Sequence, residues 1–404
     1  MYTLPFLFLV SGLLSAAIYA VSTWTPLMAL VFRDLQSPGA LYFVHLFMLG
    51  GALMIAFGAT YQLLSVVLGR EIWSRKLGFV HYAFFALGTI LLLVAFLNFR
   101  PPDIALAATL VWISVLLFAV NVGMTMGLAK KWDAVIFSVA GATFFLVMAA
   151  TLGWLMGLSL AGWIKLPHLT PILLAHMWFA GVGWFGLLIS GFSYKLLSMF
   201  FLAHGVPLGI RRWTSALWFL SGFFGGFSFF IAGPGRIWLV GPLLLGLASL
   251  GYALHVRQIQ SARNKNNPGP GIQLAVRLNV LLPALSLLIL VLSGWLLREK
   301  PGHETAVRWV ALMIGAYLLG WVGLTILAYL SKIFPFLWWT ARYGQRVGQG
   351  RVPTVNQLLN ETWTRRLLRL VFALTFSTVP QLMDKYSIEG IPPRLLPASS
   401  AGCS

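Results

Sequence analysis

The sequence predicts an all-α protein, a polytopic membrane bundle of about ten transmembrane helices. Of its 404 residues, 59% are hydrophobic and only 9% are charged, and the mean hydropathy is +0.87. So little polar surface could not cover the core of a water-soluble protein. Apolar runs of about 20 residues, each long enough to cross roughly 30 Å of hydrocarbon as a helix, recur along nearly the whole chain.

Ten apolar runs are candidate transmembrane spans. Residues 4–32 lack a basic segment ahead of them and form too long a run for a signal sequence, so we expect them to stay in the mature protein. Proline or glycine stands at many of the borders, where a missing amide proton does least harm. The predicted spans are 4–32, 39–68, 78–98, 104–129, 134–161, 169–202, 213–233, 237–256, 272–297 and 306–337.

Basic residues predict the orientation of these spans. Lysine and arginine are denser in the loops after even-numbered spans than after odd-numbered ones, with residues 298–308 as the exception. By the positive-inside rule the N-terminus is cytoplasmic. This sidedness explains the net charge of +19 better than nucleic-acid binding does, because the spans leave no room for a binding domain. No nucleic-acid partner is expected.

The chain divides into a transmembrane domain, residues 1–340, and a basic tail, residues 341–404, in the cytoplasm or on the membrane surface. Within the tail, residues 361–378 are predicted to form either an amphipathic helix on the inner leaflet or an eleventh span. Cys403 is the only cysteine, which excludes a disulfide framework and a cysteine-based metal site.

A motif, G-W-x-G-L-x-I, occurs at residues 183–189 and again at 320–326, and a weaker copy lies around residues 50–65. The offsets between copies are 133 and 137 residues. We interpret Trp184 and Trp321 as packing residues and the motif glycines as positions where helices approach closely. The chain is therefore predicted to contain three pseudo-repeats, centred on spans 39–68, 169–202 and 306–337.

Histidines inside two spans are the candidate functional residues. All nine carboxylates fall in loops, at span ends or in the tail, which disfavours an ion-coupled carrier. His45 and His176 lie inside spans two and six. An intramembrane imidazole needs a partner, and neutral imidazole is the usual protein ligand of heme iron. For each, a packed histidine bonded to a neighbouring helix is the alternative. The other five are expected at interfaces or in loops: His81, His168, His204, His255 and His303.

The two candidate histidines are not copies of one ligand. Alignment of the units places them two residues apart, roughly 200° apart around a helix. If the units stand around a common axis, opposite faces of neighbouring units can point into the same crevice. A heme between the second and sixth spans is therefore geometrically possible.

Spans two and six resemble a known family. His45 with Gly50, the run Phe-Gly-Ala-Thr-Tyr-Gln at 57–62 and Gly-Arg at 69–70, together with the copy from His176 onward, look like the tenth helix of the heme-copper oxidase catalytic subunit. The resemblance covers residues 1–345. It implies three arcs of helices, a cytoplasmic N-terminus and metal ligands nearer the outer surface.

The same resemblance implies that the oxygen-reducing centre is missing. Family members use six metal-binding histidines, on the second, sixth, seventh and tenth helices. Here His45 and His176 are the candidates on the second and sixth, and the seventh span has no histidine. Met313 and Gly315 stand where the histidine pair of the tenth helix should be. Copper is therefore not expected.

The resemblance implies a divergent member with one low-spin b-type heme, held by His45 and either Met313 or His176. Met313 as a plain core residue is the alternative. The protein would serve respiratory electron transfer or sensing in a bacterial inner membrane, and as an enzyme it would be an oxidoreductase component. Its expected partners are the lipid bilayer and subunits of a respiratory complex. The other interpretations are a heme-free structural or assembly subunit of such a complex and, third, a transporter.

Overall fold

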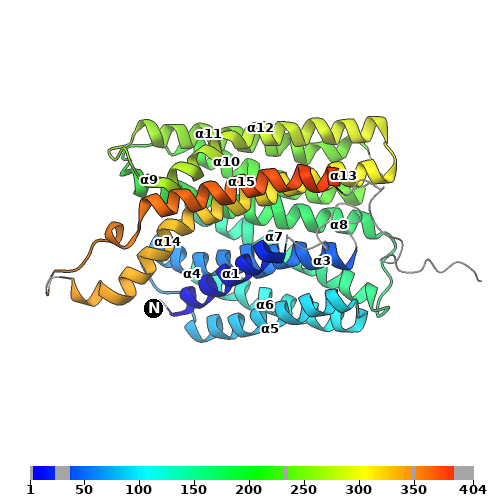
Figure 1. The fold of residues 1–404 in the computed structure, drawn as a ribbon, viewed down its shortest axis with the longest axis horizontal. Helices are drawn as coiled ribbons and strands as arrows, with labels where there is room; N and C mark the ends of the chain where they lie inside the picture. The colour runs from blue at the N-terminus through cyan, green and yellow to red at the C-terminus, as the bar shows by residue number, and fades with distance from the viewer. Residues whose placement is uncertain (1–2, 23–36, 232–234, 348, 350, 386–404) are drawn as a thin grey trace, which may run out of the picture.

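The described chain is a bundle of helices with the architecture of a multi-pass membrane protein (Figure 1). This computed structural model describes residues 3–22, 37–231, 235–347, 349 and 351–385. Within these residues all regular structure is helical, and ten helices are long and apolar enough to cross a membrane. The predicted all-α membrane bundle is confirmed to that extent.

Helix ends lie close to the predicted ones, except that residues 23–32 of the first predicted span lie outside the described residues. Three spans, the second, sixth and tenth, each combine α-helix and π-helix. The elements are α1 (Thr3–Ser22), α3 (Pro38–His45), η2 (Leu46–Leu53), α4 (Met54–Leu68), α5 (Arg75–Asn98), α6 (Pro101–Gly127), α7 (Ala134–Leu160), α8 (Leu169–Trp178), η3 (Phe179–Gly186), α9 (Leu187–Phe201), α10 (Gly209–Ile231), η4 (Arg236–Leu239), α11 (Val240–Ser261), α12 (Pro270–Glu299), α13 (His303–Gly315), η5 (Ala316–Gly323), α14 (Leu324–Tyr343), η6 (Gly344–Arg346), η7 (Val355–Leu358) and α15 (Glu361–Lys385).

Side-chain caps, prolines and one glycine set several helix ends. Ser74 Oγ accepts a hydrogen bond from the Leu77 amide at 3.2 Å, and Asp133 Oδ1 accepts one from the Ile136 amide at 3.1 Å. Proline occupies the first turn of α3, α6 and α12, where its missing N–H costs nothing. At the end of α4, Gly69 has a φ of 64°, in the left-handed region that terminates helices.

One end of the bundle, called here the basic end, carries the loops 69–74, 128–133, 202–208 and 262–269. These loops are tied to one another in pairs. Arg70 donates to the Leu128 carbonyl at 3.1 Å, and Asn264 Nδ2 donates to the Leu202 carbonyl at 2.8 Å. The described start of the chain lies at this end, at the left of Figure 1.

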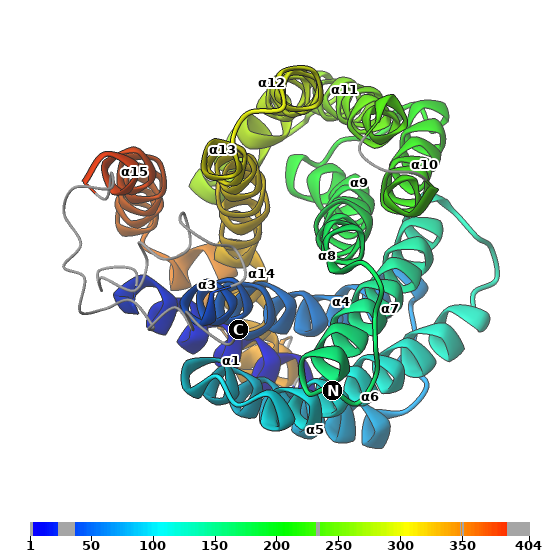
Figure 2. The ribbon, with the colours of Figure 1, turned by 90° about the vertical axis from the view of Figure 1, so that its right-hand side faces the viewer.

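Span six lies inside the bundle. In Figure 2, which looks along the helices, α8 and α9 are enclosed by α10, α11, α12 and α13 on one side and by α7 on the other. The span packs on α7 and α10, and η3 contacts η5. Phe47 of η2 also lies against η5, where its Cζ is 2.9 Å from the position of a Cβ on Gly323. The three π-helical segments therefore meet in the middle of the bundle.

The π-helical segments occur at regular intervals along the chain. They begin at Leu46, Phe179 and Ala316, and so lie 133 and 137 residues apart, as the copies of the sequence motif do. Long π-helical segments are rare and are often found at functional sites. The repeat relationship itself stays a prediction.

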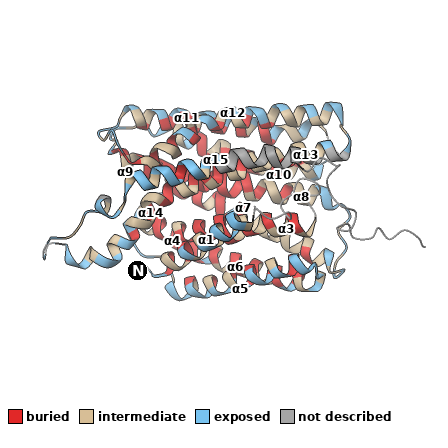
Figure 3. Ribbon diagram, viewed as in Figure 1, coloured by how far each residue is buried: buried red, intermediate tan, exposed pale blue. Residues whose placement is uncertain are grey.

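Large aromatic side chains fill the middle of the bundle, where buried residues gather (Figure 3). Trp184, Trp218 and Trp321 are all buried. The rings of Trp218 and Trp321 stack with centroids 5.8 Å apart, and Trp321 Nε1 donates to Asn279 Oδ1 at 3.0 Å. A Cβ on Gly186 would collide with the Trp218 ring. The packing role predicted for the motif tryptophans and glycines is confirmed at these positions.

The last described helix, α15, runs parallel to the spans along the outside of the bundle (Figures 1 and 2). It contacts α12 and α14. Its first turns carry the exposed Arg365, Arg366 and Arg369. Among the described residues α15 is not one of the ten helices long and apolar enough to cross a membrane, so both alternatives for residues 361–378 stay predictions. The preceding helix α14 continues to Tyr343, past the predicted domain boundary at residue 340.

Candidate functional site

His45 is the last residue of α3 and directly precedes η2. Its side chain is half-buried, and its Nδ1 lies 2.7 Å from the Leu41 carbonyl one turn earlier. A neutral imidazole donates its Nδ1 proton to such a carbonyl, which leaves Nε2 with a free lone pair. The ring also packs on that of Phe96 in α5, with centroids 4.8 Å apart. Backbone and packing together fix the orientation of this imidazole.

His176 lies in α8, three residues before η3. Its Nδ1 lies 2.7 Å from the Ala149 carbonyl of α7. Gly153, one turn further along α7, makes room for the ring, because a Cβ there would stand 2.9 Å from Cε1 of His176. A single face of α7 therefore both accepts the Nδ1 proton and accommodates the imidazole.

The two imidazoles share one arrangement of their nitrogens. Each Nδ1 is bonded to a backbone carbonyl, which sets the tautomer with the proton on Nδ1 and Nε2 as the available ligand. Within the described part of the chain no hydrogen bond reaches Nε2 of His45 or His176. Neither Nε2 is sealed inside the packing, in contrast to Nε2 of His81. Both Nε2 atoms are thus without a hydrogen-bond partner in the described structure.

The two histidines lie in corresponding halves of the second and sixth spans, each on the side of its π-helical segment away from the basic end. Around His176, residues 171–174 and 176–178 of α8 are half-exposed although the helix lies inside the bundle (Figure 2). In η3, by contrast, seven of eight residues are buried. Span six is therefore tightly packed along η3 and α9, whereas the side chains around its histidine are less buried.

Met313, the third predicted ligand, lies in α13 and is half-buried against the hydrophobic core. It stands three residues before η5, as His176 stands three residues before η3. His176 and Met313 both stay predicted second ligands beside His45.

His81 is fully buried, which corrects its predicted interfacial position. Its Nδ1 lies 3.0 Å from Tyr61 Oη, and the rings of Phe8, Phe57, Phe85 and Phe118 surround it. The reason is the Ser74 cap, which starts α5 at Arg75 rather than at residue 78, so that His81 falls inside the helix and faces α1 and α4. The sequence signal was the serine three residues before a leucine at the start of an apolar run.

His255 is also buried, with Nδ1 3.3 Å from Gln258 Oε1, and this too corrects the predicted interfacial position. It lies on the side of α11 that faces Tyr194, with ring centroids 5.2 Å apart. His168 and His204 are exposed as predicted, and the side chain of His303 lies outside those described.

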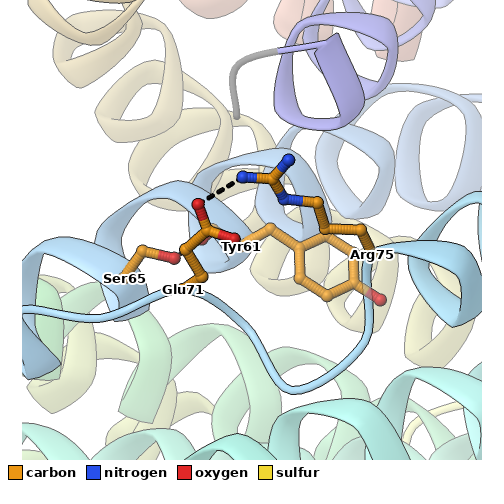
Figure 4. Close-up of polar contacts among 4 residues, drawn as sticks. All are labelled: Tyr61, Ser65, Glu71 and Arg75. Atoms are coloured by element: carbon orange, nitrogen blue, oxygen red, sulfur yellow. Dashed lines mark hydrogen bonds and ion pairs between the residues drawn. The ribbon is translucent and has the colours of Figure 1, made fainter.

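A small cavity of about 120 Å³ lies at the basic end, where Tyr61, Ser65, Glu71 and Arg75 form part of its lining (Figure 4). Glu71 and Arg75 form a half-exposed ion pair, and Ser65 Oγ donates to the Tyr61 carbonyl at 2.9 Å. Exposed ion pairs contribute only about 0.2–1 kcal/mol. Tyr61 and Ser65 lie in the second half of α4, and Glu71 and Arg75 come after it, at the far end of span two from His45. The cavity is therefore separate from the histidine site.

Two imidazoles are a donor set that a heme could use. Among the described residues no three histidine, cysteine or carboxylate side chains gather into a metal-binding group. A heme needs only axial ligands from the protein, because the porphyrin supplies the rest, and two free imidazole nitrogens suffice.

Comparison with known proteins adds no assignment. No protein-family model matches this chain, and no curated protein matches it. Its function is therefore argued from the site.

Proposed function

We propose that this chain is a membrane heme protein in which His45 and His176 hold one low-spin b-type heme for electron transfer or sensing. The supporting observation is the pair of imidazoles whose Nδ1 atoms are fixed on backbone carbonyls while both Nε2 atoms are free. The half-exposed helix α8 inside the bundle supports a space beside them. A heme bound there supplies one-electron exchange.

The residues of the chain set how such a heme is held. The Leu41 and Ala149 carbonyls accept the Nδ1 protons, which orients each ring and makes each Nε2 a more basic ligand. Phe96 packs on His45, and the absence of a side chain at Gly153 makes room for the His176 ring. His45 and His176 would hold the heme for one-electron exchange, which favours electron transfer or sensing over oxygen chemistry.

We also propose that the three central spans are related units and that the chain is a divergent relative of heme-copper oxidase catalytic subunits. The matching offsets of the π-helical segments support the repeats. A cytoplasmic N-terminus is supported by the basic loops at that end of the bundle. Residence in a bacterial inner membrane with respiratory subunits as partners belongs to the same proposal.

The test is a reduced-minus-oxidised visible spectrum of the detergent-purified full chain with pyridine hemochrome quantification. The expected result is a b-type signal at about one heme per chain. His45→Ala and His176→Ala should each lose it, because either change removes one axial ligand. His168→Ala is the matched control, since His168 is exposed at the start of α8.

Other outcomes separate the alternatives. A signal lost in His45→Ala and Met313→Leu but kept in His176→Ala would assign the methionine as second ligand. A flat spectrum from folded wild-type protein made with ample heme would contradict the proposal and favour the heme-free structural or assembly role.

A further inference from the structure

A second cavity, of about 540 Å³ and wide open to the surface, lies at the basic end between the start of α10 and the last turns of α11. Pro207, Ile210 and Leu254 supply its apolar wall. Its polar wall comes from Arg257, Gln258 and Ser261. It belongs to neither the histidine site nor the small cavity beside Tyr61.

An exposed stripe on one face of α11 leads into this cavity. Leu243, Leu247, Leu250 and Leu254 are 43–50% exposed and follow one another at intervals of three or four residues. Such spacing keeps them in one row along the helix. Arg257 and Ser261 continue the same row toward the basic end and are also exposed. The side chains of this row therefore change from an apolar leucine to a cationic arginine and then to a serine hydroxyl within two helical turns.

The positive charge at the end of this row is not neutralised by the protein. The ion pairs among the described residues join Arg75 to Glu71, Arg100 to Asp103 and Arg298 to Glu299. Arg257 has no carboxylate partner in the described structure. A second cation, Arg211, lies in the first turn of α10 next to Ile210 of the apolar wall. The cavity therefore favours an anion.

We propose that this cavity binds the headgroup of an anionic phospholipid, with its phosphate on Arg257 and an acyl chain along the leucine row of α11. Basic pockets between transmembrane helices are a known type of site for anionic headgroups. A free phosphate ion would use Arg257 but not the leucine row, so the row points to a lipid as the source of the anion.

The experiment is native mass spectrometry of the detergent-purified full chain, titrated with phosphatidylglycerol. Phosphatidylethanolamine with the same acyl chains tests the headgroup charge, and glycerol phosphate tests whether the acyl chains matter. Arg257→Gln should weaken phosphatidylglycerol binding about tenfold, because a charge-assisted hydrogen bond is lost. Ala262→Trp should weaken it similarly by filling the cavity while keeping every charge.

Arg342→Gln is the matched control, since Arg342 is exposed in the last turn of α14 at the same end of the bundle. It should bind phosphatidylglycerol as the wild type does. The proposal is overturned if Arg257→Gln binds like the wild type, or if Arg342→Gln loses as much affinity as Arg257→Gln. Equal binding of phosphatidylethanolamine, or of glycerol phosphate, would overturn it as well.

Discussion

Replacing Gly153 with alanine tests whether the fixed position of His176 controls a bound heme, and so rests on the proposed function. The new Cβ would stand 2.9 Å from Cε1 and 3.3 Å from Nδ1 of the ring. Carbon atoms in good contact are about 3.5–4.0 Å apart, so the imidazole has to move by roughly half an ångström or more. That movement stretches the 2.7 Å bond from Nδ1 to the Ala149 carbonyl.

The size of the effect follows from this hydrogen bond. A bond of this type has a net worth of about 1 kcal/mol, which corresponds to about fivefold in heme affinity. A weaker Nδ1 bond makes Nε2 a less basic ligand and destabilises the ferric form more than the ferrous one. The same free energy, applied to a one-electron couple, raises the reduction potential by about 40 mV.

The assay is a potentiometric titration of the reduced-minus-oxidised signal, together with heme retention on dilution. Gly123→Ala is the control, because Gly123 lies in α6 with nothing within 4 Å of its added Cβ. If Gly153→Ala matched Gly123→Ala in both potential and retention, the reasoning about the His176 ring would fail.

Two further predictions concern the bundle without any cofactor. Gly186→Ala places a methyl group against the buried Trp218 ring, and this overpacking should lower the free energy of unfolding by about 1–3 kcal/mol. The variant should therefore unfold in detergent at a lower temperature than Gly123→Ala does. Equal unfolding temperatures would contradict the packing of Gly186 on Trp218. Asn121→Ala removes two side-chain hydrogen bonds, of 3.0 and 2.9 Å, to the backbone of Ser74 at the end of the loop 69–74. Amide hydrogen exchange in that loop should therefore accelerate. Unchanged exchange would show that other contacts hold the loop.

The spans could be predicted because the physics of the bilayer leaves few choices. A run of apolar residues in hydrocarbon has to satisfy its backbone groups internally, and a helix does so. The carboxylates could be placed for a similar reason, since an unpaired charge avoids the apolar interior. Glu71, Asp103 and Asp133 accordingly lie in a loop or at helix starts.

The histidine site could be predicted only in part. The depth of His45 and His176 follows from their place in an apolar run, but the carbonyls that fix their Nδ1 atoms depend on contacts that spacing does not show. Ala149 lies 27 residues from His176 and meets it only through the packing of α7 on α8. The burial of His81 differs from the prediction because α5 begins at Arg75, directly after the Ser74 cap, and not at residue 78.

The π-helical segments allow the central spans to lose a residue without losing their helical structure. Deleting one residue from an α-helix turns everything beyond the cut by about 100°, which would destroy the packing of a span. A π-helical segment resembles an α-helix with extra chain inserted, so it can lose a residue by becoming α-helical. In the second, sixth and tenth spans, deletion of one residue within the π-helical segment would therefore rotate the half that carries His45, His176 or Met313. The half toward the basic end would keep its packing.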